Sequence, residues 1–212
     1  LVALERRWLH AADGILVLSR FSEHLLTGRY PDLQPRVRVV RGGVSSSLLD
    51  TPSERPADVR ARLGTGERTL LFTARRLEPR MGVDLLVDAI ELLDDANVQL
   101  IVAGDGPDRR RLEELVRVRG LEDRIRLLGR VTESELAALY AASDLFVMPS
   151  VAFEGFGLST VEALGHGTPV LGTAVGATPE ILEQLGDAFV VPSTDAPALA
   201  EGIGRVLPLL GP

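Results

Sequence analysis

Two glutamates, Glu154 and Glu162, stand eight positions apart in the segment EGFGLSTVE, with a glycine-rich turn between them. Gly155 and Gly157 allow the backbone to approach a ligand closely, and a helix beginning at this turn would offer unpaired N–H groups to a phosphate. Glu154 either accepts hydrogen bonds from two adjacent sugar hydroxyls or is a solvated loop acid. Glu162 either binds a ligand or forms a capping box with Ser159, which stands in S-x-x-E register with it.

A cluster of arginines follows the apolar run TLLFTA. Arg75, Arg76 and Arg80 lie in the segment RRLEPRMG, and guanidinium groups match phosphate oxygens with two parallel hydrogen bonds. These arginines and the amides of the glycine-rich turn could hold a diphosphate if the fold brings the two loops together. The alternative is that one or two of them pair with Glu78 or Asp84 on the surface.

The composition excludes several kinds of chemistry. The chain has no cysteine, and all 23 basic residues are arginine. These absences exclude thiol nucleophiles, cysteine-ligated zinc, Schiff-base lysines and the P-loop lysine. The three histidines share no motif spacing, so neither a metal nor a cofactor is expected. The segments AGDGPDRR and GFGLST lack the third glycine of the dinucleotide-binding fingerprint.

Charge and hydropathy limit the partners and the location. The formal net charge of −7 does not favour a nucleic-acid surface. Apolar residues make up 45% of the chain, as in soluble globular proteins, and no apolar run has the length of a membrane span. The first residues, LVALERRWLH, carry charges where a signal peptide has its apolar stretch. We therefore expect a cytoplasmic protein, and the opening is typical of a piece of a longer chain.

The elements that must position these residues alternate along the sequence. Apolar runs predict strands at 14–19, 36–40, 69–74, 98–104, 125–129, 145–150, 168–174 and 188–192. Helix-period segments lie at 20–30, 82–95, 107–120, 133–143, 159–167, 178–186 and 196–207. This alternation predicts an α/β fold with a Rossmann-like parallel sheet and helices on both faces. Ligands of such sheets bind at the carboxyl ends of the strands, where both charged segments are expected.

A domain boundary is expected in the segment RGGVSSSLLDTPSERPADVR, where glycine, serine and proline replace the periodic pattern. Residues 1–43 would form one unit, with two helices around a strand and a second strand at its end. Residues 44–212 would form the other. The first unit is too small to hold a core alone and must pack on something else.

Five segments together resemble the carboxyl-terminal half of a family-four retaining glycosyltransferase, whose fold is named GT-B. They are RRLEPRMGVDLLVDA, VQLIVAGDGPDRRRLEEL, IRLLGRVTESELAALYAASDLFVMPS, EGFGLSTVEALGHGTPV and GATPEIL. They occur in the family's order over about residues 40–205. Each is weak alone, and their joint specificity is high. Glu154 and Glu162 match the two ends of the family's signature, in which seven residues separate two glutamates.

The resemblance implies a role for each matching residue around the turn. Glu154 would contact hydroxyls of the donor sugar, and Glu162 would bind the ribose hydroxyls of the nucleotide. The backbone amides of Gly157, Leu158 and Ser159 would face the diphosphate.

The resemblance extends to the loops on either side of the turn. The nucleobase would lie against Arg130 and Val131. Arg76 and Arg80 would bind the diphosphate and stabilise it electrostatically as it leaves, without a metal. The family usually has a lysine where this chain has Met81, which cannot bind phosphate, and Arg80 is the plausible substitute.

The resemblance implies the donor-binding half of an enzyme that transfers a sugar from a nucleoside-diphosphate sugar with retention, in polysaccharide or glycoconjugate biosynthesis. The acceptor would bind an amino-terminal domain of which residues 1–43 resemble the last elements. That other half could also make peripheral membrane contact, and this chain alone is expected to be inactive. One alternative is a non-catalytic nucleotide-binding or structural module with a degenerate donor site, which Met81 favours. A sugar-nucleotide epimerase of the same overall fold is less consistent with the glutamate spacing.

Overall fold

A six-stranded parallel sheet forms the centre of the larger domain in the computed structural model, which describes residues 2–44, 52 and 54–210. Its strands are β3 (Thr69–Ala74), β4 (Val98–Ala103), β5 (Ile125–Gly129), β6 (Leu145–Met148), β7 (Val170–Thr173) and β8 (Val190–Val191). The order across the sheet is β5-β4-β3-β6-β7-β8, and each neighbouring pair is parallel. The apolar runs form these strands because a sheet covered on both faces excludes water from both sides.

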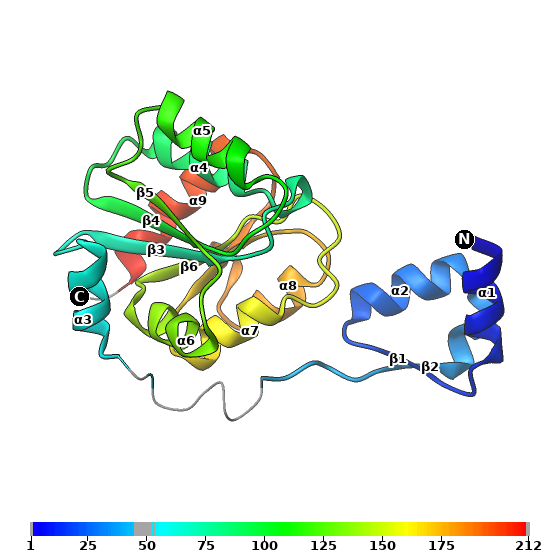
Figure 1. The fold of residues 1–212 in the computed structure, drawn as a ribbon. Coiled ribbons are helices and arrows are strands. Elements are labelled where there is room, and N and C mark those ends of the chain that lie inside the picture. The colour runs from blue at the N-terminus through cyan, green and yellow to red at the C-terminus, as the bar shows by residue number, and fades with distance from the viewer. Residues whose placement is uncertain (1, 45–51, 53, 211–212) are drawn as a thin grey trace.

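Helices cover both faces of this sheet (Figure 1). One face packs against α4 (Val83–Leu93), α5 (Arg109–Val118) and α9 (Ala196–Val206). The other face packs against α3 (Pro56–Leu63), α6 (Glu133–Ala142), α7 (Leu158–Gly165) and α8 (Thr178–Leu182). The predicted Rossmann-like α/β fold is confirmed.

Three aromatic rings fill the core between the sheet and α6. Phe72 of β3, Phe146 of β6 and Tyr140 of α6 are fully buried, with ring centroids 5.3 to 5.7 Å apart. The rings meet at tilted or edge-to-face angles, which suit the charge distribution of aromatic rings. This packing fixes Tyr140, whose hydroxyl contacts Glu162.

A smaller unit precedes the main domain. It consists of α1 (Val2–Ala11), β1 (Ile15–Val17), α2 (Arg20–Arg29), a 3₁₀ turn (Pro31–Arg36) and β2 (Val37–Val39). Its two strands pair in parallel and form a sheet separate from the six-stranded one. Buried side chains in this unit are few, and Trp8 and Leu16 are largely exposed. The start of α2 lies beside α8 of the larger domain (Figure 1).

The segment between the two sheets differs in part from the expected linker. The sequence predicts irregular structure over 41–60, but α3 begins inside it at Pro56. Proline opens this helix, and Gly64, with a left-handed φ of 68°, closes it. The part of the predicted linker at 45–51 and 53 lies outside the described residues. The division between residues 43 and 44 stays a prediction.

Within the described ranges, no helix combines the length and the apolar character needed to cross a membrane.

Candidate functional site

The predicted site lies where the chain changes direction across the sheet. Strands β3 and β6 are neighbours, but β4 follows β3 on one side and β7 follows β6 on the other. Such a switch point leaves a crevice beyond the carboxyl ends of the strands. A pocket of about 530 Å³ occupies this place, and a second pocket of about 390 Å³ adjoins it. The two pockets share four residues, which are Ala74, Arg75, Arg76 and Ser159.

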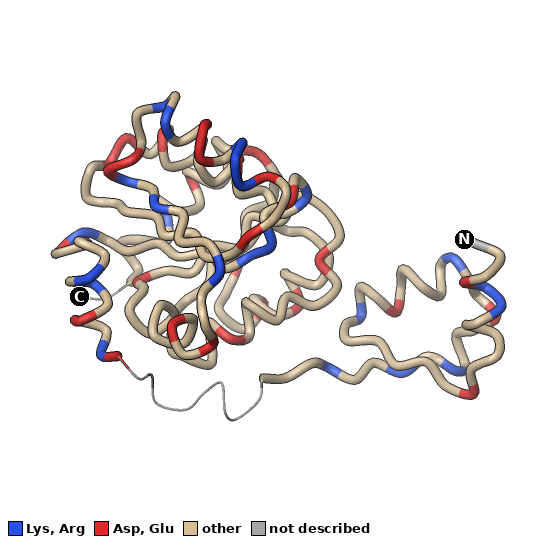
Figure 2. Tube along the Cα trace, viewed as in Figure 1, with Lys and Arg blue, Asp and Glu red and all other residues tan. Residues whose placement is uncertain are grey.

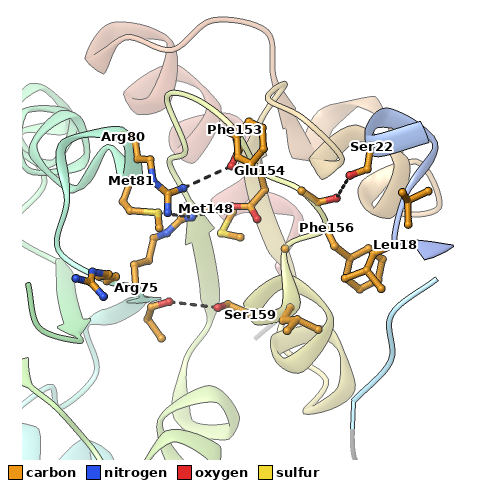
Figure 3. Close-up of a pocket in the computed structure, with 16 residues that line it drawn as sticks. Leu18, Ser22, Arg75, Arg80, Met81, Met148, Phe153, Glu154, Phe156 and Ser159 are labelled. Atoms are coloured by element: carbon orange, nitrogen blue, oxygen red, sulfur yellow. Dashed lines mark hydrogen bonds and ion pairs between the residues drawn. The ribbon is translucent and has the colours of Figure 1, made fainter. Parts of the chain in front are cut away.

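Three separate parts of the chain form the wall of the larger pocket (Figure 3). They are the segment after β3, the loop between β6 and α7, and the end of β1 with the start of α2. Their lining residues include Arg75, Arg76, Arg80 and Met81 from the first, 153–159 from the second, and Val17, Leu18 and Ser22 from the third. The predicted phosphate-binding and acidic segments therefore lie together.

Arg75 and Glu154 form a buried ion pair in this wall (Figure 3). Arg75 Nη2 lies 2.8 Å from Glu154 Oε2, and the two side chains are 4% and 14% exposed. Ser150 Oγ accepts from Arg75 Nη1 at 2.7 Å and donates to Glu154 Oε2 at 3.0 Å. Burial lowers the pKa of Arg75, the charge of Glu154 opposes this, and a guanidinium stays protonated in proteins. The interpretation of Glu154 as a solvated loop acid is wrong.

The two arginines chosen from the resemblance lie nearer the rim. Arg76 and Arg80 line the larger pocket, with side chains 67% and 44% exposed. Both pair with Glu78, at 2.5 Å from Arg76 Nε and 3.3 Å from Arg80 Nε. Met81 places its sulfur 3.1 Å from Arg75 Nη2. The sequence named Arg75 as one of three candidate arginines, but the resemblance assigned the diphosphate to Arg76 and Arg80 alone. Arg75 is the first side chain after the buried strand, and so the nearest of the three to the strand's carboxyl end.

Other arginines form surface pairs that contrast with this buried one. Figure 2 shows acidic and basic residues interleaved over the helices of the α4 and α5 layer. Arg111 binds Asp84 at 3.0 Å, and Arg117 binds Glu114 at 2.6 Å. Exposed pairs of this kind contribute about 0–1 kcal/mol each. Asp84 therefore pairs with Arg111. The sequence had left open a pair between Asp84 and one of the three loop arginines.

Two glycines hold the backbone on either side of the buried pair. A Cβ on Gly104, at φ +127°, would lie 1.8 Å from the carbonyl oxygen of Arg75. A Cβ on Gly176, at φ +60°, would lie 2.0 Å from the carbonyl oxygen of Glu154. Any side chain at either position would move a loop that carries the pair.

Helix α7 begins at Leu158, directly after the glycine turn. Its N-cap is Gly157 in a left-handed conformation, with φ +84° and no side-chain capping bond. Ser159 Oγ instead donates to the carbonyl oxygen of Ala74 at 3.3 Å. The capping-box interpretation of Glu162 is therefore wrong. Gly157, Leu158 and Ser159 at the start of the helix line the larger pocket, and the helix has no side-chain cap, which suits an anion.

Glu162 lies in the wall of the smaller pocket and accepts a hydrogen bond from Tyr140 Oη at 2.9 Å. Burial and the negative charge of Glu162 raise the pKa of Tyr140 well above its ordinary value of 10.0. The phenol therefore keeps its proton and donates a hydrogen bond to the carboxylate. The ring of His166 stacks on Tyr140 with a centroid distance of 5.6 Å. Sequence reasoning missed Tyr140, whose only signal is a hydroxyl within an otherwise apolar helical pattern.

The remaining predicted residues also line the smaller pocket. Arg130 and Val131 lie beside Asp105, and Arg130 Nε is 3.7 Å from Asp105 Oδ2. Arg130 is largely exposed, so its side chain is available to a ligand. Over the residues with described positions, no group of three or more His, Cys, Asp or Glu side chains could hold a metal ion.

Comparison with known proteins identifies the family. Residues 67–208 match the family of glycosyl transferases group 1. The chain belongs to this family. An uncharacterized glycosyltransferase of Methanocaldococcus jannaschii is 31% identical to this group 1 glycosyltransferase over 210 residues, 97% of this chain and 53% of that protein. The phosphatidyl-myo-inositol mannosyltransferase of Mycobacterium leprae is 36% identical over 150 residues, 69% of this chain and 38% of that protein.

Solved structures agree with the family assignment. Anabaena HepE in complex with UDP and glucose superposes with a TM-score of 0.82 at 26% identity, over 92% of this chain and 54% of that one. Sucrose-phosphate synthase from Thermosynechococcus elongatus gives a TM-score of 0.81 at 31% identity, over 97% and 52%. This group 1 glycosyltransferase chain has the GT-B fold, corresponds to its carboxyl-terminal half, and spans about half the length of these relatives. The assignment gives no support to the epimerase interpretation.

Proposed function

We propose that this group 1 glycosyltransferase chain binds a nucleoside-diphosphate sugar across the two adjoining pockets, and that the whole enzyme transfers the sugar with retention. The observation that carries the proposal is the buried pair of Arg75 and Glu154 beside the uncapped start of α7. A guanidinium and backbone amides can bind phosphate oxygens, and the carboxylate can bind sugar hydroxyls. HepE, at 26% identity, has been crystallised with UDP-glucose, which supports this choice of ligand.

The diphosphate would lie in the larger pocket, between the start of α7 and the arginines after β3. The amides of Gly157, Leu158 and Ser159 would donate to its oxygens from one side. Arg76 and Arg80 would approach from the rim, after exchanging Glu78 for phosphate. Their exposure supports this role, because a rim side chain can turn toward a ligand at little structural cost.

The sugar and the ribose would each bind one of the glutamates. The bonds from Arg75 and Ser150 both end on Oε2 of Glu154, which leaves Oε1 to accept from a sugar hydroxyl. The bond from Tyr140 likewise ends on Oε2 of Glu162. The separation of the two acids into different pockets supports two different ligand parts.

The nucleobase would occupy the outer part of the smaller pocket, against Arg130 and Val131. The two pockets share residues at the end of β3, so one extended ligand can fill both without a break. In this pose the ribose lies over Glu162, between the base and the diphosphate.

In the transfer step, the bond between the anomeric carbon and the phosphate oxygen breaks, and the nucleoside diphosphate leaves with the electron pair. The oxygen of an acceptor hydroxyl then bonds to the same face of the sugar, which is retention, and the hydroxyl proton passes to the departing diphosphate. Arginines and backbone amides aimed at the leaving oxygens stabilise the charge that develops there, without a metal. Neither glutamate is assigned a proton-transfer role.

The acceptor site belongs, in this proposal, to the portion of the relatives that this chain does not cover. We therefore expect the 212-residue chain alone to bind donor but to catalyse little transfer. A cytoplasmic location, with peripheral membrane contact through the other half, is part of the same proposal.

The contact of Met81 with Arg75 favours one alternative function. The sulfur of Met81 lies 3.1 Å from the Arg75 guanidinium and carries no charge that could bind a diphosphate. The resemblance implies a lysine at this position. The alternative is a non-catalytic nucleotide-binding or structural module with a degenerate donor site. Donor affinity separates the two functions.

Calorimetric titration of the chain with uridine, guanosine and adenosine diphosphates, and with their glucose or mannose derivatives, tests the proposal. We expect one base series to bind. Glu162→Gln should weaken that binding by about tenfold, since a hydrogen bond to a charged group contributes about 1.5–3 kcal/mol. Glu113→Gln, on the exposed face of α5, is the matched control and should leave the dissociation constant unchanged.

Failure of every nucleotide to bind would refute the proposed function. Equal binding by wild type and Glu162→Gln would refute the ribose role of Glu162. The anomeric configuration of a product made by the whole enzyme, measured by nuclear magnetic resonance, tests retention separately.

A further inference from the structure

The loop that carries Glu154 is held by the smaller amino-terminal unit. Ser19 Oγ donates to the carbonyl oxygen of Gly155 at 2.6 Å. Ser22 Oγ, drawn in Figure 3, donates to the same oxygen at 3.1 Å. These residues lie 136 and 133 positions away from Gly155 in the sequence. Ser19 is only 2% exposed. One carbonyl in the wall of the larger pocket thus accepts hydrogen bonds from two hydroxyl groups of the smaller amino-terminal unit.

The two serines stand on an element that is itself fixed to the larger domain. Ser19 is the N-cap of α2 and accepts from the backbone N–H of Ser22 at 3.0 Å. Glu180 of α8 accepts from the next amides of α2, those of Arg20 at 3.0 Å and Phe21 at 2.6 Å. A carboxylate at a helix N-terminus also interacts favourably with the helix dipole. The start of α2 is therefore held against α8, and the serines cannot easily leave Gly155.

A second contact from the same unit covers the next residue of the loop. The ring of Phe156 lies so close to Gly42 that a Cβ on this glycine would come within 2.6 Å of a ring carbon. Phe156 is a buried side chain. The segment that leaves β2 therefore packs on the loop beside the carbonyl held by the serines.

The conformation of the loop needs such support. Phe153 has a left-handed φ of +55°, which costs a non-glycine residue about 1–3 kcal/mol unless its surroundings impose it. The carbonyl of Glu154 accepts from the N–H of Ala177 at 2.9 Å, and the carbonyl of Gly155 accepts from the serines. Two successive peptide groups are thus fixed by two different parts of the chain. Their orientation decides where the Glu154 carboxylate and the Gly157 amide point.

We propose that Ser19 and Ser22 are positioning residues of the donor site, which hold the 153–157 loop through the Gly155 carbonyl. This inference rests on the proposed donor function. It assigns the serines to the sugar-diphosphate end of the ligand, because the loop lines the larger of the two adjoining pockets and not the smaller. The nucleoside end, at Glu162, depends on Tyr140 of α6 and on α7 itself, whereas the carbonyl to which Ser19 and Ser22 donate belongs to Gly155 in the loop before α7.

The test compares two ligands of the base that binds best, a nucleoside-diphosphate sugar and the nucleoside monophosphate, by calorimetry on the 212-residue chain. The double variant Ser19→Gly/Ser22→Ala removes both hydroxyls, and glycine is tolerated at an N-cap. We expect the nucleotide sugar to bind about tenfold more weakly, from two lost hydrogen bonds, and the monophosphate within about twofold of wild type.

Three further variants keep the result interpretable. Ser22→Ala alone preserves the cap and should weaken nucleotide-sugar binding by about threefold. Ser22→Thr keeps a hydroxyl and should bind the nucleotide sugar with the affinity of wild type. Thr27→Ala removes a hydroxyl of the same helix that bonds within α2, and should change neither affinity.

Two outcomes overturn the inference while leaving the proposed function intact. One is unchanged nucleotide-sugar binding by the double variant, and the other is an equal loss for both ligands, which indicates a purely structural role. Wild-type protein that binds neither ligand overturns the proposed function and this inference together.

Discussion

Removing one member of the buried Arg75–Glu154 pair should destabilise the domain, whereas removing both should not. The two charges lie 2.8 Å apart with side chains 4% and 14% exposed, so neither is well hydrated. Breaking a buried pair from one side costs about 3–5 kcal/mol, because the remaining charge stays buried without a partner. Glu154 keeps some contact with water, so we expect about 3 kcal/mol for Arg75→Met.

The double variant Arg75→Met/Glu154→Leu replaces both charges with apolar side chains of similar size. Replacements of this kind are often neutral or stabilising, so we expect a free energy of unfolding within about 1 kcal/mol of wild type. The variant should nevertheless lose binding of the diphosphate sugar. If the double variant recovers wild-type stability but does not bind the diphosphate sugar, the pair serves ligand binding and not stability.

Thermal and urea unfolding followed by circular dichroism measure these effects. In a protein of this size 1 kcal/mol corresponds to about 2–4 °C in Tm, so Arg75→Met should lower Tm by about 6–12 °C. The matched control is Arg117→Met, which breaks an exposed pair and should change stability by under about 1 kcal/mol. The reasoning is refuted if Arg75→Met is as stable as the control, or if the double variant is no more stable than Arg75→Met.

Further predictions concern the groups around the pair. Tyr140→Phe removes the donor to Glu162 and should weaken nucleotide binding by about tenfold in calorimetry, with a normal circular dichroism spectrum. Because the folded pKa of Tyr140 is raised above 10.0, its stabilisation is complete below that pH and is lost as pH rises, so alkaline unfolding should begin later in Tyr140→Phe. Met81→Lys should change diphosphate affinity by under about threefold if Arg80 already supplies the charge. A gain above about tenfold would favour the degenerate module.

The sequence was sufficient to predict the strands, because buried parallel strands are continuous apolar runs. The predicted limits 69–74 and 125–129 coincide with β3 and β5. Helix α3 was missed because serine and proline dominate the residues before it, although Pro56 and Gly64 mark its two ends. The capping box failed because Gly157, in a left-handed conformation, took the N-cap position that the S-x-x-E pattern assigns to Ser159.

The site was predicted less completely, since its geometry depends on contacts between distant segments. The resemblance placed the phosphate arginines at Arg76 and Arg80, but the most buried guanidinium is one residue earlier, at Arg75. Which of the three loop arginines, Arg75, Arg76 or Arg80, turns inward depends on the backbone after β3. That backbone is set by the close approach of Gly104, which no local pattern reveals. The contact of Ser19 with Gly155 is likewise a product of tertiary structure.

The two glutamates of the signature have different neighbours and therefore suit different parts of a ligand. Glu154 accepts from a guanidinium and a serine hydroxyl, and Glu162 accepts from a phenol that keeps its proton. Each acid lies in its own pocket, and its partners named above all donate hydrogen bonds to it. This geometry favours hydroxyl recognition over acid–base chemistry.

In the proposed function, the charge of a departing diphosphate is met by the arginines and by the amides of α7. Arg75 is already balanced by its acid partner, and Met81 adds only a neutral sulfur. The remaining positive charge lies on Arg76 and Arg80, which share Glu78 at the rim. Each guanidinium that turns from Glu78 to phosphate exchanges a weak, solvated pair for a bond inside a less hydrated pocket, where the same charges interact more strongly. In the proposed function, donor binding and the ordering of this rim should therefore occur together, and the two exposed arginines would supply the electrostatic stabilisation in place of the absent lysine.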